Sequence, residues 1–267
     1  MTKLILIIGI FFLSCCQANH YEITKKTIEI GHKQNLEEKI YQTKNFKIFT
    51  LQKITNQAEP IRIYLEGDGK AFINKYTISQ NPTPTSYFLI NLIAQDDSPN
   101  IIYIARPCQF IDDKKCEEKY WTNARFSKEI IDSLNEVLAN FSKNKIELIG
   151  YSGGGAIALY LADRNNNILN LRTIAGNLDH EKFSEIHEVS KLDLSLQNKD
   201  LNFNKLAKIP QIHFVGSEDK IIPRVIVESY LKKLPIKNCA RIIDVNKANH
   251  WSGWDKKWSE IIKIKLH

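Results

Sequence analysis

Residues 145–161 read KIELIGYSGGGAIALYL, and this stretch decides the fold of the chain. It begins as a short apolar strand, turns sharply through glycines, and continues as a helix rich in Ala and Leu. The turn has the pattern G-x-S-x-G, filled by Gly150, Ser152 and Gly154. The neighbours of the serine must be small, because the backbone is tightly bent there. Such a turn lifts the Ser152 hydroxyl clear of the sheet edge and places the next N–H groups at a helix N-terminus, where they can stabilise a developing oxyanion.

The segments around this turn alternate between apolar strands and helices. The expected strands are 61–65, 101–105, 168–175, 211–216 and 241–245, and the expected helices are 86–95, 126–141, 225–234 and 254–266. Residues 21–54 alternate loosely between apolar and polar side chains, which predicts two or three antiparallel strands at one edge of the sheet. The alternation of strand and helix predicts an α/β fold with a mostly parallel central sheet and helices on both faces.

The strand, turn and helix around Ser152 resemble the nucleophile elbow of the α/β-hydrolase superfamily. The resemblance implies that an acid and then a histidine follow, each at the carboxyl end of a strand. Asp219 comes after the strand 211–216 and precedes an Ile-Ile-Pro step, and His250 comes after the last strand. Glu218 is the alternative acid, although the family spacing favours Asp219. The resemblance therefore implies Ser152 as nucleophile, Asp219 as acid and His250 as base.

Each of these residues also has a purely structural interpretation. A glycine-rich turn is usually only a turn, and Glu218 and Asp219 could cap the helix that follows them. A histidine before a tryptophan, such as His250, could be a packed or surface residue. The hydrolase hypothesis rests on the three residues occurring together in the required order.

The loop after strand 61–65 is the expected source of a second oxyanion-binding N–H group. In α/β-hydrolases this loop often carries a His-Gly-x-Gly pattern. Here Glu66-Gly67-Asp68-Gly69 stands in its place, so the first position departs from the pattern. By this alignment the oxyanion hole comprises the N–H groups of Gly153 and Asp68. The Asp68 side chain is expected to point away from the oxyanion, because a carboxylate there would repel the developing charge. The alternative is an ordinary turn between a strand and a helix.

The N-terminus has the features of an export signal. Lys3 precedes an unbroken apolar run, residues 4–13, which is too short to span a bilayer and fits a secretory signal. Ser14-Cys15-Cys16 is similar to a bacterial lipobox, with Cys15 or Cys16 as the lipidated residue. A rival cut after Ala18 would give simple secretion. We expect residues 1–18 to be the signal peptide and residues 19–267 to form a single domain, periplasmic, membrane-anchored through the lipid, or secreted.

Three further cysteines lie in the expected domain. Cys108 and Cys116 are close together in a polar loop, and in an exported protein such a pair predicts a disulfide. A metal site is the alternative, but no histidine or further cysteine flanks the pair. Cys239 lies next to an apolar strand and is expected to be a buried free thiol.

The charge distribution and the motifs present limit the classes of partner and cofactor that we expect. The chain of 267 residues has a formal net charge of +7, but its lysines are scattered and no run is dense enough for nucleic-acid binding. No zinc-finger or Walker-type spacing occurs, and no metal or organic cofactor is expected. The expected partner is a small acyl substrate, with attachment to a membrane through the N-terminal lipid.

The function predicted from the resemblance is that of a serine hydrolase, with a carboxylic ester as the first choice of substrate. A peptidase, amidase or thioesterase of the same fold is the enzymatic alternative, and an exported binding protein that has lost activity is the alternative from another class. Residues 177–210 are polar and weakly patterned. Insertions at this point of the superfamily often form a lid or pocket wall, and a small lid is one interpretation of this segment. His180 and His187 lie in this segment, where an exposed loop histidine is the commoner case.

Overall fold

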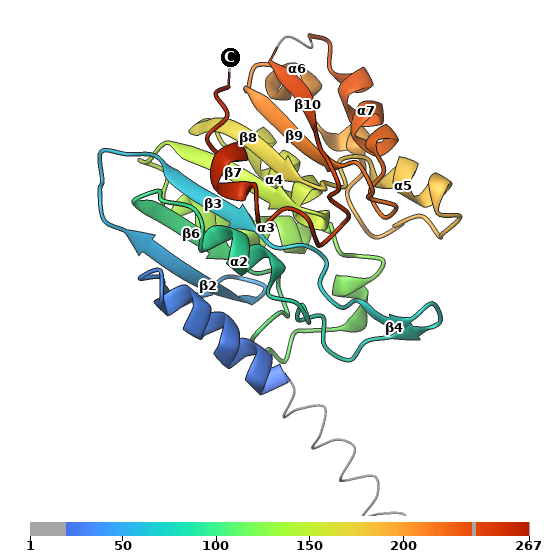
Figure 1. Cartoon of the computed structure of the whole chain (residues 1–267). Helices are drawn as coiled ribbons and strands as arrows, with labels where there is room; N and C mark the ends of the chain where they lie inside the picture. The colour runs from blue at the N-terminus through green and yellow to red at the C-terminus, as the bar shows by residue number, and fades with distance from the viewer. Residues whose placement is uncertain (1–19, 237–238, 267) are drawn as a thin grey trace, which may run out of the picture.

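The computed structural model describes residues 20–236 and 239–266, which form an eight-stranded sheet with helices on both faces (Figure 1). The strands are β1 (Glu37–Gln42), β2 (Lys47–Ile54), β3 (Ile61–Leu65), β6 (Asn100–Ile104), β7 (Ile146–Tyr151), β8 (Ile168–Ile174), β9 (Gln211–Gly216) and β10 (Ala240–Val245). Their order across the sheet is β1-β2-β6-β3-β7-β8-β9-β10. Only β2 runs against the others. The predicted mostly parallel sheet is confirmed.

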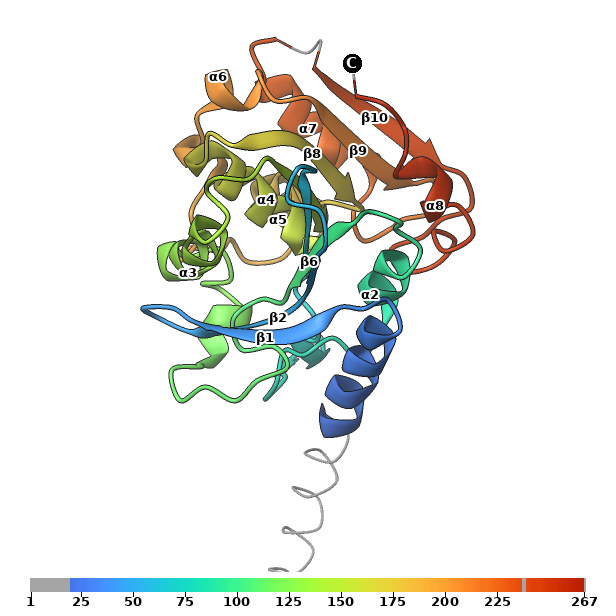
Figure 2. The same cartoon turned by 90° about the vertical axis from the view of Figure 1, so that its left-hand side faces the viewer.

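Helices cover the two faces of the sheet (Figure 2). One face packs against α3 (Lys128–Ala139), α4 (Gly153–Arg164), α6 (Phe203–Leu206) and α7 (Arg224–Lys233). The other face packs against helical residues 20–32, α2 (Phe88–Ile93) and α8 (Trp258–Ile261). The remaining elements are α5 (His180–Ile186), which packs on α7, and the short 3-10 helices η1 (Glu118–Trp121) and η2 (Asn198–Asp200).

Strand periodicity produces two apolar cores, one on each face. Along β3, Ile61, Ile63 and Leu65 belong to the core under α3 and α4, whereas Tyr64 belongs to the core under α2 and α8. Successive side chains of a strand point to opposite faces, so a sheet covered on both sides needs apolar residues at nearly every position. This is why the central strands read as mostly apolar runs, interrupted by single polar residues such as Arg62 in β3 and Glu147 in β7.

Residues 20–32 are helical, so the predicted strand at the start of this region is wrong. The buried positions are Ile23, Thr27 and Gly31, which are four residues apart and therefore share one face of a helix. The loose alternation of Ile28 and Ile30 suggested the wrong period. The two later strands, β1 and β2, do form the predicted antiparallel edge.

The predicted closing helix over 254–266 is also wrong, since α8 is only one turn long. Trp254, Trp258 and Ile262 are fully buried at helical spacing, but separate turns place them there. The indole N–H of Trp254 donates to the carbonyl of Asn249 at 2.7 Å, which ties this segment to the loop before it. The apolar spacing thus predicted burial correctly but not the hydrogen bonding of the backbone.

A two-stranded hairpin, β4 (Phe72–Asn74) and β5 (Thr77–Ile78), follows the loop after β3 and projects from the domain (Figure 1). No signal in the sequence predicted this hairpin. At its turn the Asn74 side chain accepts hydrogen bonds from the N–H groups of Tyr76 and Thr77, at 2.9 and 3.0 Å. An Asn that bonds the backbone two residues ahead is a turn-former that needs no glycine.

Cys108 and Cys116 are joined by a disulfide, with their Cα atoms 5.7 Å apart. Cys239 has a free thiol, but it is half-buried rather than buried as expected. The expected signal peptide and both candidate lipidation sites, Cys15 and Cys16, lie outside the described residues. Within the described part of the chain, no helix combines the length and apolar character needed to cross a bilayer.

Candidate active site

Ser152 stands between the end of β7 and the start of α4, with φ of 51° and ψ of −121°. Such a backbone conformation is rare for a residue with a side chain and is found where the surrounding structure enforces it. Two close approaches enforce it here. A Cβ on Gly150 would lie 2.4 Å from the carbonyl oxygen of Gly154, and a Cβ on Gly154 would lie 2.3 Å from that of Leu65. Both glycines of the motif are therefore required by packing.

The turn brings Ser152 within hydrogen-bond distance of His250. Ser152 Oγ lies 3.0 Å from His250 Nε2, although the two residues are 98 positions apart in the sequence. His250 follows β10, and the Tyr151 hydroxyl donates to its backbone carbonyl at 3.2 Å. The Tyr151 ring also lies beside the imidazole, with ring centroids 5.4 Å apart. The imidazole is thus held against the serine from one side by the elbow itself.

Asp219 is the acid that contacts His250. Its Oδ2 lies 2.9 Å from His250 Nδ1, and its Oδ1 accepts the N–H groups of Ile221 and Ile222 at 2.8 and 2.9 Å. Both side chains of the Asp219–His250 pair are buried. Glu218 is exposed on the surface, so the structure places Asp219 and not its neighbour at the histidine.

The loop after β3 lies directly against the elbow. A Cβ on Gly153 would lie 2.2 Å from Asp68 Oδ1, so the Asp68 carboxylate abuts the start of α4. The expectation that this side chain points away from the site is therefore wrong. Within the described residues, neither the N–H of Asp68 nor that of Gly153 donates to a protein acceptor.

Two arginines balance the charge of Asp68. Arg106 donates to Asp68 Oδ1, and Arg125 Nη1 lies 3.7 Å from Oδ2. Burial alone would raise the pKa of Asp68, but Arg125 and Arg106 outweigh it and hold the pKa below its usual value. One carboxylate and two guanidinium groups carry a net positive charge, so the cluster as a whole does not repel an oxyanion. Neither arginine was identified from the sequence, because both lie in loops distant in sequence from Gly67 and Ser152.

A cavity of about 540 Å³ opens beside Ser152 and His250. Its wall comes from the segment 66–89 and from the residues around the acid and the histidine. The lining includes apolar side chains (Phe72, Phe88, Leu89, Tyr151, Ile221 and Trp251) and polar ones (Glu66, Asp68, Lys70, Thr85 and Ser86). No residue of 177–210 lines it, so the interpretation of this segment as a lid or wall is wrong.

Glu66 is a second carboxyl group at this cavity. Tyr103 donates to its Oε2 at 2.8 Å, and the N–H of Gly67 donates to its Oε1 at 2.8 Å. Burial raises the pKa of Glu66 to about 7, against these two hydrogen bonds and the charge of Arg106, which favour the carboxylate. Glu66 therefore fixes the loop that carries Asp68 and titrates near neutral pH.

We expect Glu66→Gln to remove part of the pH dependence of stability. The folded protein binds this proton more tightly than the unfolded chain, whose ordinary pKa is 4.5. The stabilising contribution is therefore complete below about pH 4.5 and is lost as the pH rises through about 7. Between pH 5 and 8 the free energy of unfolding of the variant should gain up to about 3 kcal/mol relative to the parent.

Urea unfolding of both proteins at several pH values measures this difference, because the other groups are common to both and cancel. Glu118→Gln, at an exposed position, is the matched control and should follow the parent. Parallel pH profiles of the Glu66→Gln variant and the parent would contradict the prediction.

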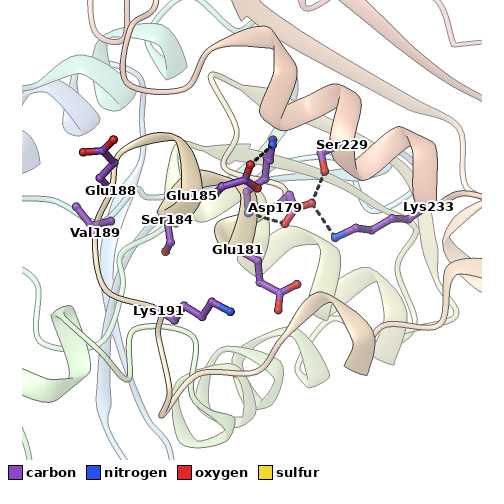
Figure 3. A pocket seen from close by; sticks show the side chains of 10 residues that line it. Asp179, Glu181, Ser184, Glu185, Glu188, Val189, Lys191, Ser229 and Lys233 are labelled. Carbon is purple, nitrogen blue, oxygen red and sulfur yellow. Dashed lines mark hydrogen bonds and ion pairs between the residues drawn. The ribbon is translucent and has the colours of Figure 1, made fainter.

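Residues 177–210 build a separate polar cavity of about 530 Å³ between α5 and α7 (Figure 3). Asp179 points toward α7, where it accepts a hydrogen bond from Ser229 at 2.6 Å and pairs with Lys233 at 2.7 Å. It also accepts the backbone N–H of Lys182 at 3.1 Å. These contacts hold α7 against α5, which is a structural role.

The two histidines of this segment have structural roles as well. His180 is buried rather than exposed, with Nε2 at 2.8 Å from the carbonyl of Leu196, and burial lowers its pKa to about 4. His187 Nε2 lies 2.8 Å from the carbonyl of Ile221. Neither lies at the cavity beside Ser152. Among the described residues, no cluster of His, Cys, Asp and Glu is suited to hold a metal ion.

Solved structures with similar folds are numerous, at low sequence identity. Est1E from Butyrivibrio proteoclasticus superposes with a TM-score of 0.57 at 12% identity, covering 85% of this chain and 96% of that one. A serine hydrolase from Cycloclasticus zankles gives 0.58 at 13% identity, with coverage of 85% and 96%. A bacterial membrane phospholipase A gives 0.55 at 13% identity, with coverage of 98% and 94%.

No protein-family model matches the chain, and no curated protein matches it. The architecture is nevertheless shared with solved structures, among them an alpha-beta serine hydrolase homologue from Coxiella burnetii. The chain has the α/β-hydrolase fold, as the sequence predicted.

Proposed function

We propose that this protein is a serine hydrolase that cleaves carboxylic esters through an acyl-enzyme on Ser152. The observation that carries the proposal is the continuous chain from Ser152 Oγ through His250 to Asp219, with contacts of 3.0 and 2.9 Å beside an open cavity. A serine hydroxyl is a poor nucleophile until a base removes its proton, and the base must be held in one tautomer. This arrangement supplies both conditions.

In the proposed reaction His250 carries its proton on Nδ1, facing Asp219. Ser152 Oγ attacks the acyl carbon while its proton passes to His250 Nε2, and the resulting oxyanion accepts the N–H groups of Gly153 and Asp68. His250 then gives the proton to the departing alkoxide, which leaves as an alcohol. A water molecule attacks the acyl-enzyme by the same route, releasing the acid and regenerating Ser152.

An ester is favoured over a peptide bond by the nature of the site and by the similar structures. The cavity wall carries large apolar side chains such as Phe72, Phe88 and Leu89, which suit an acyl chain. The solved structures with similar folds include a putative lipase from Acinetobacter baumannii and a bacterial membrane phospholipase A. A thioesterase would use the same residues. The alternative of an inactive binding protein gives no reason for the strained Ser152 backbone.

A fluorophosphonate probe tests the proposal. We expect one covalent adduct, on Ser152, located by peptide mass spectrometry. Ser152→Ala should abolish labelling, whereas Ser86→Ala, at another serine that lines the cavity, should leave it intact. An adduct on Ser86, or no adduct at all, would exclude the assignment.

A panel of 4-nitrophenyl esters, acyl thioesters and peptide anilides then ranks the substrate classes.

We also propose that the chain is exported and anchored by a lipid on Cys15 or Cys16. The support is the apolar run of residues 4–13 followed by Ser14-Cys15-Cys16. Mass spectrometry of the mature N-terminus should find a diacylglyceryl-modified cysteine. An unmodified N-terminus at Asn19 would instead establish simple secretion.

A further inference from the structure

The hairpin of β4 and β5 is unusual because its apolar side chains have no protein partner to cover them. Every residue from 72 to 77 is exposed, and the exposed fractions are 45% for Phe72, 57% for Ile73 and 86% for Tyr76. Three large apolar or aromatic side chains on one short hairpin leave an unusual amount of apolar surface exposed, which is typical of an interaction site.

The base of the hairpin, in contrast, is fixed to the domain. The Trp121 indole donates to the carbonyl of Ser79 at 2.9 Å, and the N–H of Lys70 donates to the carbonyl of Pro82 at 3.0 Å. The exposed tip is therefore presented in a defined position.

The hairpin continues into the rim of the cavity that holds Ser152. Phe72, the first residue of β4, and Lys70, two residues before it, line this cavity. Trp251 and Ile221, which are 58% and 39% exposed, line the same cavity. The cavity that holds Ser152 therefore has exposed apolar side chains on its wall, so a surface that contacts Phe72, Ile221 and Trp251 would lie next to Ser152.

The positive charge of the hairpin indicates the kind of surface that it contacts. Residues 70–80 contain Lys70 and Lys75 and no acidic residue. Lysines beside exposed aromatic residues suit a bilayer that contains anionic lipid, because the rings enter the interface while the ammonium groups stay with the headgroups.

The helix of residues 20–32 begins near the base of the hairpin. His20, the first described residue, shares a cavity with Asn81 and Thr83, which directly follow the hairpin. Cys16 precedes His20 by four positions, and four residues of chain reach at most about 14 Å. A lipid on Cys16 would therefore enter the membrane on the side of the molecule that carries the hairpin.

From these observations we infer that the β4–β5 hairpin docks on anionic phospholipid membranes, and that the esters presented to Ser152 are those of membrane lipids. The choice of substrate rests on the proposed function, whereas the docking does not. Ile73 and Tyr76 enter the interface, Lys75 contacts anionic headgroups, and Phe72 leads from the membrane to the cavity.

The test uses the full chain and two substrates, a long-chain umbelliferyl ester dissolved in vesicles and soluble 4-nitrophenyl acetate. The vesicles contain phosphatidylcholine, with or without 30% phosphatidylglycerol. The variant Ile73→Ser/Tyr76→Ser changes two hairpin residues that do not line the cavity. The control Ile40→Ser/Leu169→Ser removes two other exposed apolar side chains, 46% and 44% exposed, one on β1 and one near the start of β8, and neither lines the cavity.

We expect the hairpin variant to lose about tenfold in rate on the vesicle ester, with the rate on the soluble ester within about twofold of the parent. The control should match the parent on both substrates. Lys75→Gln should lose several-fold on anionic vesicles and nothing on neutral ones. All forms share the N-terminus, so any lipid anchor contributes equally to each.

Three results would overturn the inference. The first is an unchanged rate of the hairpin variant on the vesicle ester, which would assign the exposed apolar residues to a protein partner. The second is a loss on the soluble ester as large as that on the vesicle ester. The third is a loss in the control variant as large as that in the hairpin variant. Sedimentation with vesicles of the Ser152→Ala protein, with and without the hairpin changes, separates docking from catalysis. If no ester is hydrolysed but the hairpin changes still reduce sedimentation, the proposed function fails and the docking stands.

Discussion

Replacing Ser152 or His250 with alanine is expected to reduce ester hydrolysis by about 10⁴-fold or more. Without the hydroxyl no acyl-enzyme forms, and without the imidazole the hydroxyl keeps its proton. Because Ser152 Oγ and His250 Nε2 act in one proton transfer across 3.0 Å, neither group is useful alone. The double variant should therefore be little worse than either single one.

The measurement is kcat/KM for a soluble ester in the parent, the two single variants and the double variant. Circular dichroism and urea unfolding check that each variant is folded. Ser152→Ala is the cleaner change, because it removes one oxygen atom and leaves the buried imidazole in place. Losses that multiply in the double variant would mean that the two residues act independently, which contradicts the proposed mechanism.

Replacing Asp219 with asparagine is expected to reduce kcat/KM by about 10⁴-fold, although the shape of the side chain is almost unchanged. The Asp219 Oδ1 position accepts two backbone N–H groups, so the amide oxygen of asparagine should occupy it. The amide NH₂ then faces His250 Nδ1 and can only donate to it. The imidazole proton therefore moves to Nε2. A protonated Nε2 can no longer accept the proton of Ser152.

Glu218→Gln is the matched control for this prediction. The same chemical change one residue earlier falls on an exposed side chain, so kcat/KM should stay within about threefold of the parent. Both variants should have thermal midpoints within a few degrees of each other, which would assign the loss to catalysis. A larger loss in Glu218→Gln than in Asp219→Asn would contradict the placement of the acid.

The sequence by itself determined the features that depend on short-range pattern. The G-x-S-x-G turn at 150–154 predicted the elbow, because only glycine permits the close approaches at Gly150 and Gly154. The apolar runs predicted the central strands, because a sheet buried on both faces needs apolar side chains at successive positions. The chain order of Ser152, Asp219 and His250 followed from the family resemblance, and the fold brings these three residues together.

Tertiary structure alone decided the features that depend on which distant segments meet. Asp219 and Glu218 are adjacent in the sequence, and only the position of the His250 loop distinguishes the buried acid from the exposed one. Asp68 abuts the elbow because Arg106 and Arg125 come from other loops to balance its charge.

The cavity wall arises from 66–89 rather than 177–210, since side-chain contacts across the sheet edge are set by packing and not by local periodicity. For the same reason residues 20–32 became a helix, because Ile28 and Ile30 find an apolar core to pack against only once the chain lies on the sheet.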